Sequence, residues 1–290
     1  MRIGIVGSEN SHTVAIAKTL NIERALPGVE VTHVWGETPE LAAKAAHEGQ
    51  IPNIVAAPED MVGAVEAAVV DHRHAKHHLP AARPLIEAGM PVFVDKPFCM
   101  DLKEGVEFVR LARSKGAPIT SFSVLPLQQS ARQFGQAMKG LGPLRSFVTM
   151  GPVEIESQYG GVFFYGIHQV DFLLSLQPAR PLRVSTVRRG DSGVATIDFD
   201  DGSFGVVHCI NGWRGGFLAT AYGDKDVHHQ VLAFDDNVYL EGIRTFSRMF
   251  ETRQEPLPPT SYLRPVAVLA AMQASFDTGK MVEVEPVPEL

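Results

Sequence analysis

The chain has 290 residues, of which 45% are hydrophobic and 20% charged, as is ordinary for a globular protein. Its net charge of −7 provides no basic field that would favour nucleic acid or an anionic membrane surface as a partner. Two cysteines are too few for a disulfide framework and fit a reducing cytoplasm. The apolar run Ile3–Val6 is too short for a signal peptide, and no run of ~18 apolar residues could span a bilayer. We therefore expect a cytoplasmic protein that binds neither nucleic acid nor membranes.

Strand-like and helix-like segments alternate through the first 120 residues. Such alternation predicts βαβ units around a doubly wound parallel sheet of the Rossmann type. The expected strands are residues 2–7, 29–35, 54–56, 67–70, 92–94 and 119–124, and the expected helices are residues 13–25, 39–48, 78–88 and 102–115.

The second half of the chain is richer in consecutive strands. Short turns such as Asp200-Asp201-Gly202 separate them, which predicts a large, mainly antiparallel sheet in an α+β domain. The expected strands are residues 144–150, 182–188, 194–199, 204–210, 217–222, 229–234 and 238–241, with helices at 127–139, 163–176 and 262–278. We expect two domains, 1–120 for a dinucleotide and 121–290 for substrate binding and oligomerisation.

The segment Gly4–His12 stands where a dinucleotide fingerprint belongs, between the first strand and the first helix. Only Gly7 matches the usual glycine pattern, because Glu9 and His12 occupy the next two glycine positions. Polar groups follow Gly7 and could bind a diphosphate: Ser8, Asn10, Ser11 and His12. The motif by itself is weak, since Glu9 adds negative charge at this position.

The second strand ends in Trp35-Gly36-Glu37, where an acid usually holds the adenosine ribose. Glu37 either serves the ribose or is a solvated turn residue, and Trp35 is expected beside the ribose. No Arg or Lys stands nearby to receive a 2′-phosphate, which favours NAD and leaves NADP open.

Four histidines lie within residues 72–78, after the strand that ends before Asp71. Imidazole is a common metal ligand, but the spacing matches no known zinc class, so we expect no metal. We assign Asp71, His72 and His74 instead to the cofactor side of the sheet.

The strand Val92–Val94 ends abruptly in Asp95-Lys96-Pro97. Proline cannot continue a central strand, so the chain turns there and Lys96 lies at the carboxyl edge, where open α/β sheets bind ligands. The alternative is a solvated turn lysine.

A second motif lies further along the chain: the pattern Gly-x-His-x-x-Asp within Tyr165–Asp171. With both elements, the whole chain resembles the Gfo/Idh/MocA family of NAD(P)-dependent sugar and cyclitol oxidoreductases. The resemblance implies a polyhydroxylated small-molecule substrate, and homodimers or homotetramers built through the C-terminal sheet.

The resemblance also implies residue roles. Lys96, with Asp95 and Pro97 beside it, would approach both the nicotinamide and the substrate hydroxyl. His168 would act as general base, and Asp171 would orient it.

The family usually has an aspartate four residues before the histidine, where this chain has Phe164. Three interpretations are open. Phe164 forms an apolar wall for a less hydroxylated substrate, or another polar residue (Asp171, Tyr165 or Glu154) replaces the acid, or dehydrogenase activity has been lost. A non-redox ligand sensor, and a lyase or hydrolase that uses the cofactor transiently, are therefore alternatives to a dehydrogenase.

Overall fold

The computed structural model describes residues 1–290 and contains two sheets. The first sheet has six parallel strands in the order β3-β2-β1-β4-β5-β6, so the strand order reverses between β1 and β4. Its strands are β1 Arg2–Val6, β2 Glu30–Trp35, β3 Asn53–Ile54, β4 Ala67–Val70, β5 Val92–Val94 and β6 Ile119–Thr120. The predicted Rossmann-type sheet is confirmed, and β6 ends earlier than expected.

Helices cover both faces of this sheet because its central strands are apolar on both sides. Ile5, Val69 and Phe93 pack in one apolar cluster with α1 and with α7, Leu240–Thr252. Val6, Val70 and Val94 pack in another with α3 and α4. The elements between the strands are α1 Ser11–Ala17, the π-helix Lys18–Ile22, α2 Pro39–Gly49, α3 His78–Glu87, α4 Leu102–Ser114 and short 3₁₀ turns at Pro58–Met61 and Ala75–His77.

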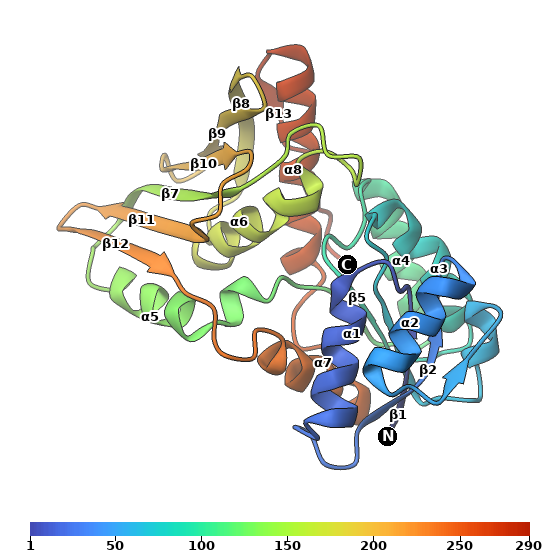
Figure 1. Cartoon of the computed structure of the whole chain (residues 1–290). Helices are drawn as coiled ribbons and strands as arrows, with labels where there is room; N and C mark the ends of the chain where they lie inside the picture. Colours follow the sequence, from blue (N-terminus) through green and yellow to red (C-terminus); the bar gives the residue numbers. More distant parts are fainter.

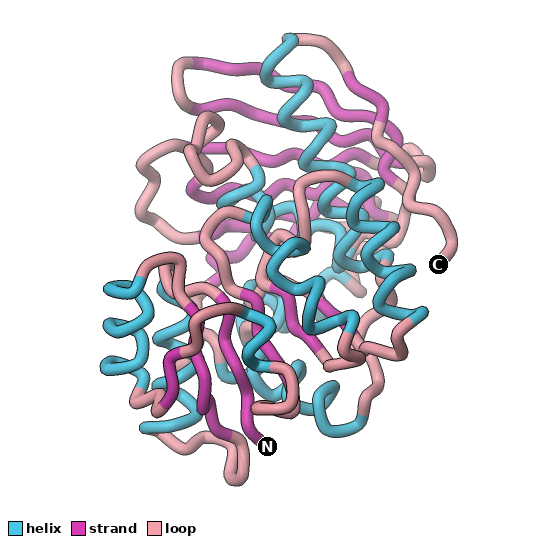
Figure 2. The backbone as a smooth tube through the Cα atoms, turned by 90° about the vertical axis from the view of Figure 1, so that its right-hand side faces the viewer, coloured by secondary structure: helices cyan, strands magenta, loops and turns pink.

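The second sheet has seven strands in the order β12-β11-β7-β10-β9-β8-β13 (Figures 1 and 2). It is mainly antiparallel, as predicted, and only β7 and β10 run parallel. Its strands are β7 Leu144–Pro152, β8 Pro181–Arg189, β9 Ser192–Phe199, β10 Phe204–Ile210, β11 Phe217–Gly223, β12 Val227–Leu232 and β13 Val282–Glu283.

Helices cover only one face of the second sheet. Phe147, Val207 and Ala219 on that face are buried with α5 Gln129–Met138, α6 Phe163–Leu176 and α8 Thr260–Thr278. A 3₁₀ turn, Leu125–Leu127, precedes α5. No helix of the chain is both long and apolar enough to cross a membrane.

The expected strand at residues 238–241 is wrong, because the chain forms helix α7 over Leu240–Thr252. Ile243, Phe246 and Phe250 recur at helical spacing and are buried against the first sheet, with Phe93 and Phe246 stacked at 4.9 Å between ring centroids. Residues from the second half of the sequence thus complete the core beneath the first sheet, beside α1 in Figure 1. The short apolar run at residues 238–241 is compatible with a strand. The chain is helical there because a helix buries the apolar side chains that follow along one face.

Candidate active site

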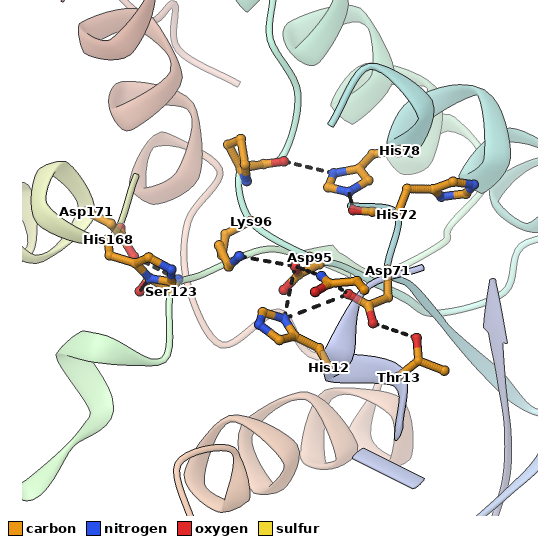
Figure 3. A network of polar contacts seen from close by, with 12 residues as sticks. His12, Thr13, Asp71, His72, His78, Asp95, Lys96, Ser123, His168 and Asp171 are labelled. Atoms are coloured by element: carbon orange, nitrogen blue, oxygen red, sulfur yellow. Dashed lines mark hydrogen bonds and ion pairs between the residues drawn. The ribbon is translucent and has the colours of Figure 1, made fainter. Parts of the chain in front are cut away.

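Lys96 follows β5 at the carboxyl edge of the first sheet, as the sequence predicts. Its side chain is only 9% exposed, and Nζ lies 3.6 Å from Oδ2 of Asp95 (Figure 3). The Lys96–Pro97 peptide bond is cis, and the carbonyl oxygen of Pro97 lies 2.9 Å from Nδ1 of the buried His78. With its side chain 9% exposed and Asp95 beside it, the ammonium lies in a largely dry position, which excludes a solvated turn lysine.

Two buried carboxyl groups, Asp71 and Asp95, lie beside the lysine. Asn10 donates to both, at 2.7 Å and 3.2 Å, and Thr13 Oγ1 donates to Asp71 at 2.6 Å. Burial and the charge of Asp95 raise the pKa of Asp71 well above its usual range. Burial would also raise the pKa of Asp95, but the charges of Lys96 and His12 outweigh it and lower that pKa. The pair therefore carries one negative charge, on Asp95 beside the lysine.

His12, from the first turn of α1, completes this cluster. Its Nδ1 lies 3.2 Å from Asp95 and 3.8 Å from Asp71, and its ring packs on Tyr239 at 4.9 Å between centroids. His12, Asp71 and Asp95 bring three potential metal-ligating atoms within 4.8 Å of one another, whereas the histidines of residues 72–78 form no such group. Because Lys96 and hydrogen-bond donors already balance the two carboxyl groups, the absence of a metal stays our prediction.

His168 lies on α6, in the second half of the chain. Its Nδ1 is 2.7 Å from Oγ of Ser123, and the Ser123 N–H donates to Oδ2 of Asp171 at 2.8 Å (Figure 3). Burial and the nearby positive charge of Lys96 hold the pKa of His168 well below its usual range, so the imidazole is neutral at neutral pH. Asp171 makes its hydrogen bond to Ser123 rather than to His168, and burial raises its pKa to about 7.

A cavity of about 520 Å³ brings Lys96 and His168 together with the loop after β1. It is lined by residues from both halves of the molecule: Ser8, Glu9, Asn10, Ser11, His12, Val14, Leu41, Lys44, Ala45, Glu48, Arg73, Lys96, Phe164, Tyr165 and His168. Asp171 does not line it and instead borders a second cavity of about 350 Å³. The larger cavity is the only one of the two that joins the lysine and histidine motifs.

The loop after β1 is shaped by close backbone contacts. Gly7 has φ of +114°, and a Cβ there would lie 2.6 Å from the carbonyl oxygen of Asp71. The carboxylate of Glu37 accepts from the N–H groups of Ser8 and Glu9 at 2.8 and 3.0 Å, while its other oxygen is buried without a partner. Glu9 turns toward the second half of the molecule, where its carboxylate accepts from the Tyr159 hydroxyl at 3.1 Å.

The remaining residues predicted on the cofactor side lie around this loop. Trp35 donates to the carbonyl of Ala56 and packs near His72, with ring centroids 5.7 Å apart. His72 is buried with Nδ1 unpartnered, and burial lowers its pKa to about 3. His74 is half-buried, and its Nδ1 accepts from the N–H of Lys76. Trp35, His72 and His74 do not line the large cavity.

Sequence reasoning missed Ser123, the polar partner of His168. Its signal was its position three residues after β6, at the same carboxyl edge that holds Asp71 and Lys96. It was missed because the strand was expected to run to residue 124, which would have made Ser123 part of the sheet.

Residues 1–122 match the family model described as "Oxidoreductase family, NAD-binding Rossmann fold", that of Gfo/Idh/MocA. The matched segment holds the first sheet and the lysine motif, and it is 122 of the 290 residues. The resemblance drawn from the lysine and histidine motifs is thereby confirmed. A comparison with curated protein sequences finds no match.

Solved structures of this family's dehydrogenases share the fold over nearly the whole chain. Myo-inositol 2-dehydrogenase from Lactobacillus plantarum is 16% identical, with 98% of this chain and 99% of that chain covered and a TM-score of 0.85. Scyllo-inositol dehydrogenase from Lactobacillus casei, with bound NAD(H) and scyllo-inositol, is 15% identical, with coverage of 98% and 99% and a TM-score of 0.84. GenD2 from gentamicin A biosynthesis, in complex with NAD, is 17% identical, with coverage of 99% and 97% and a TM-score of 0.86.

The residues present fit the family's cofactor, NAD. Asn10, the N-cap of α1, makes no side-chain hydrogen bond to the first turn, so that turn's N–H groups are left for a diphosphate. The unpartnered oxygen of Glu37 is an acceptor of the kind that a ribose hydroxyl needs. The departures from the glycine pattern therefore leave a polar cradle in place.

Proposed function

We propose that this protein is an NAD-dependent dehydrogenase that oxidises a secondary alcohol of a sugar, cyclitol or derivative, or reduces the corresponding ketone. The observation that carries the proposal is the common cavity of Lys96 and His168, which come from opposite halves of the chain. The cavity also reaches the loop after β1, so one space can receive both cofactor and substrate. The structural similarity to inositol dehydrogenases supports a polyhydroxylated substrate.

Lys96 orients the substrate hydroxyl and stabilises the negative charge that develops on its oxygen. The neighbouring Asp95 holds the ammonium in place, with Nζ 3.6 Å from its Oδ2. Because the side chain is 9% exposed, this interaction acts in a region poor in water, where it is stronger than in solvent.

His168 takes the hydroxyl proton. For this role its own proton sits on Nδ1 and is donated to Oγ of Ser123, which lies 2.7 Å away and also accepts from the N–H of Leu125. Nε2 is then free to accept a proton, and the lowered pKa of the imidazole keeps it unprotonated at neutral pH.

NAD, when bound, supplies the acceptor for the substrate's hydride. On the protein side, Gly7, Ser8, Asn10, Ser11 and His12 form the diphosphate cradle. Glu37 binds the adenosine ribose, with Trp35, His72 and His74 beside it. A negative carboxylate at the ribose disfavours a 2′-phosphate, which supports NAD over NADP.

We also propose that the enzyme forms a homodimer or homotetramer through the uncovered face of the second sheet. Support comes from apolar side chains that share this face by strand register and are about half exposed, among them Phe204, Tyr222, Val227 and Val231.

The two free, buried cysteines support a cytoplasmic location. The division into a cofactor domain (1–120) and a substrate domain (121–290) fits the two sheets.

The test is a titration with NADH and NADPH followed by tryptophan fluorescence, then a screen of cyclitols and sugars with NAD. We expect saturable quenching at micromolar NADH, weaker binding of NADPH, and NADH formation with at least one polyol. Failure to bind either cofactor would contradict the dehydrogenase assignment. Binding without reduction across the screen would favour a ligand sensor on the same scaffold.

A further inference from the structure

Arg73 is a charged residue of the large cavity that the proposed chemistry does not use. It stands two residues after Asp71, at the carboxyl edge of the first sheet, and lines the same cavity as Lys96 and His168. Its guanidinium makes no ion pair within 4.0 Å and no hydrogen bond, although its side chain is exposed on the wall of a site.

Aromatic stacking holds this guanidinium in place. Its Cζ lies 4.2 Å from the ring centroid of Tyr159 and 5.4 Å from that of Phe164, and the two rings are 4.9 Å apart. Contact with two aromatic rings restricts the motion of the guanidinium without using its N–H groups, which remain available for a ligand. By contrast, Arg83 lies over the ring of Phe108 at 5.8 Å but also pairs with Glu87.

The phenylalanine at position 164 determines which ligand charge this part of the cavity favours. An aspartate at this position, as the family resemblance implies, would add a negative charge to the cavity and compete for the arginine. With phenylalanine, the wall is apolar and supports the arginine instead. Of the two acids on the cavity wall, Glu9 accepts from the hydroxyl of Tyr159, and neither Glu9 nor Glu48 pairs with Arg73.

We propose that Arg73 is a substrate-binding residue that recognises an anionic group, so that the substrate is a sugar or cyclitol derivative with a carboxylate or a phosphate. The inference rests on the dehydrogenase function proposed above. A guanidinium offers two parallel N–H groups to a carboxylate or phosphate. An anionic ligand group that leaves water for the cavity needs such donors. The hydroxyl to be oxidised would then lie between Lys96 and His168, with the anionic group held by Arg73.

The experiment compares D-glucose, D-glucuronate and D-glucose 6-phosphate, and the corresponding galactose series, as substrates with NAD. We expect the wild-type protein to prefer an anionic member of a series over its neutral sugar by roughly 10- to 100-fold in kcat/KM, the range for charge-assisted hydrogen bonds. Arg73→Gln should bring this ratio to about one, mainly through KM. Arg83→Gln, the matched control outside the cavity, should leave the ratio unchanged.

Three outcomes would overturn the proposal: a neutral sugar preferred by the wild type, an unchanged ratio in Arg73→Gln, or a loss of NADH affinity in Arg73→Gln that accounts for the whole effect. The last would assign the arginine to the cofactor diphosphate. If no compound is oxidised either in these series or in the cyclitol and sugar screen, the proposed function fails. The anion site is then tested by calorimetric titration of the NADH-loaded protein with the same compounds. Binding of glucuronate or glucose 6-phosphate that Arg73→Gln removes would still support the anion site, and absence of such binding would refute it.

Discussion

Oγ of Ser123 lies 2.7 Å from Nδ1 of His168, and this contact joins the carboxyl edge of the first sheet to helix α6 of the second half. The serine is fixed from both sides, because its N–H donates to Asp171 and its Oγ accepts from the N–H of Leu125. His168 is thus oriented by a serine rather than by the acid one helical turn away.

Ser123→Ala should therefore lower kcat by roughly tenfold, a part of what a general base contributes, with little change in cofactor affinity. The variant keeps the backbone bond to Asp171, so the fold should be preserved. Ser175→Ala is the matched control on α6, since that hydroxyl bonds only to the carbonyl of Phe172. Equal kinetics for Ser123→Ala and wild type would show that His168 needs no partner or is not the base.

Lys96→Met should reduce kcat by roughly 10²- to 10³-fold, the usual effect of removing a group that stabilises a developing oxyanion. Methionine fills similar space, so folding and most of the NADH affinity should remain. The exposed Lys103→Met serves as control for loss of a lysine charge nearby. Steady-state kinetics and NADH titration of the same preparations make the comparison, and undiminished turnover would remove Lys96 from the mechanism.

Glu37→Gln should weaken NADH binding by roughly tenfold and narrow its advantage over NADPH, because a charged acceptor for the ribose is lost. The exposed Glu40→Gln is the matched control. Fluorescence titrations with both cofactors give the two dissociation constants. An unchanged NADH-to-NADPH ratio would mean that Glu37 only caps the loop N–H groups of Ser8 and Glu9.

Asp171 should make stability depend on pH. Burial raises its pKa to about 7, so the folded state favours the protonated acid, and its contribution is present at acid pH and lost as the pH rises toward 7. Asp171→Asn keeps an acceptor for the Ser123 N–H. It should exceed wild type in unfolding free energy by roughly 1–4 kcal/mol above pH 7, with the difference vanishing near pH 4. The lower end of this range of unfolding free energies applies if water in the cavity beside Asp171 solvates its carboxylate. Urea unfolding across this pH range measures it, and a difference independent of pH would contradict the buried-acid account.

The sequence predicted the position of Lys96 in the proposed active site better than it predicted the residues that contact this site. Lys96 was placed correctly because a buried strand followed by Asp-Lys-Pro admits few geometries. Ser123 was missed because the strand was expected to run to residue 124, whereas β6, Ile119–Thr120, ends three residues before it. Helix α7 was missed because its apolar face is matched to the distant first sheet, which only the fold brings to it.

The loop after β1 shows the same limit. Glu9 was expected to oppose a diphosphate, yet in the structure its carboxylate accepts from Tyr159, 150 residues away. Arg73 likewise acquires its setting from Tyr159 and Phe164 of the second half. Contacts between segments so far apart in sequence depend on how the two sheets are placed, which periodicity and spacing do not encode.

The central claim, that Lys96 and His168 act on one alcohol beside NAD, is tested most directly by isotope transfer. The protein is incubated with NAD and with cyclitols, sugars and sugar acids deuterated on their ring carbons, and the cofactor is examined by mass spectrometry. The account predicts NADH that carries deuterium from at least one compound with the wild-type protein, and almost none with Lys96→Met. Label transfer that persists in Lys96→Met, or none from any compound with wild type, would contradict it.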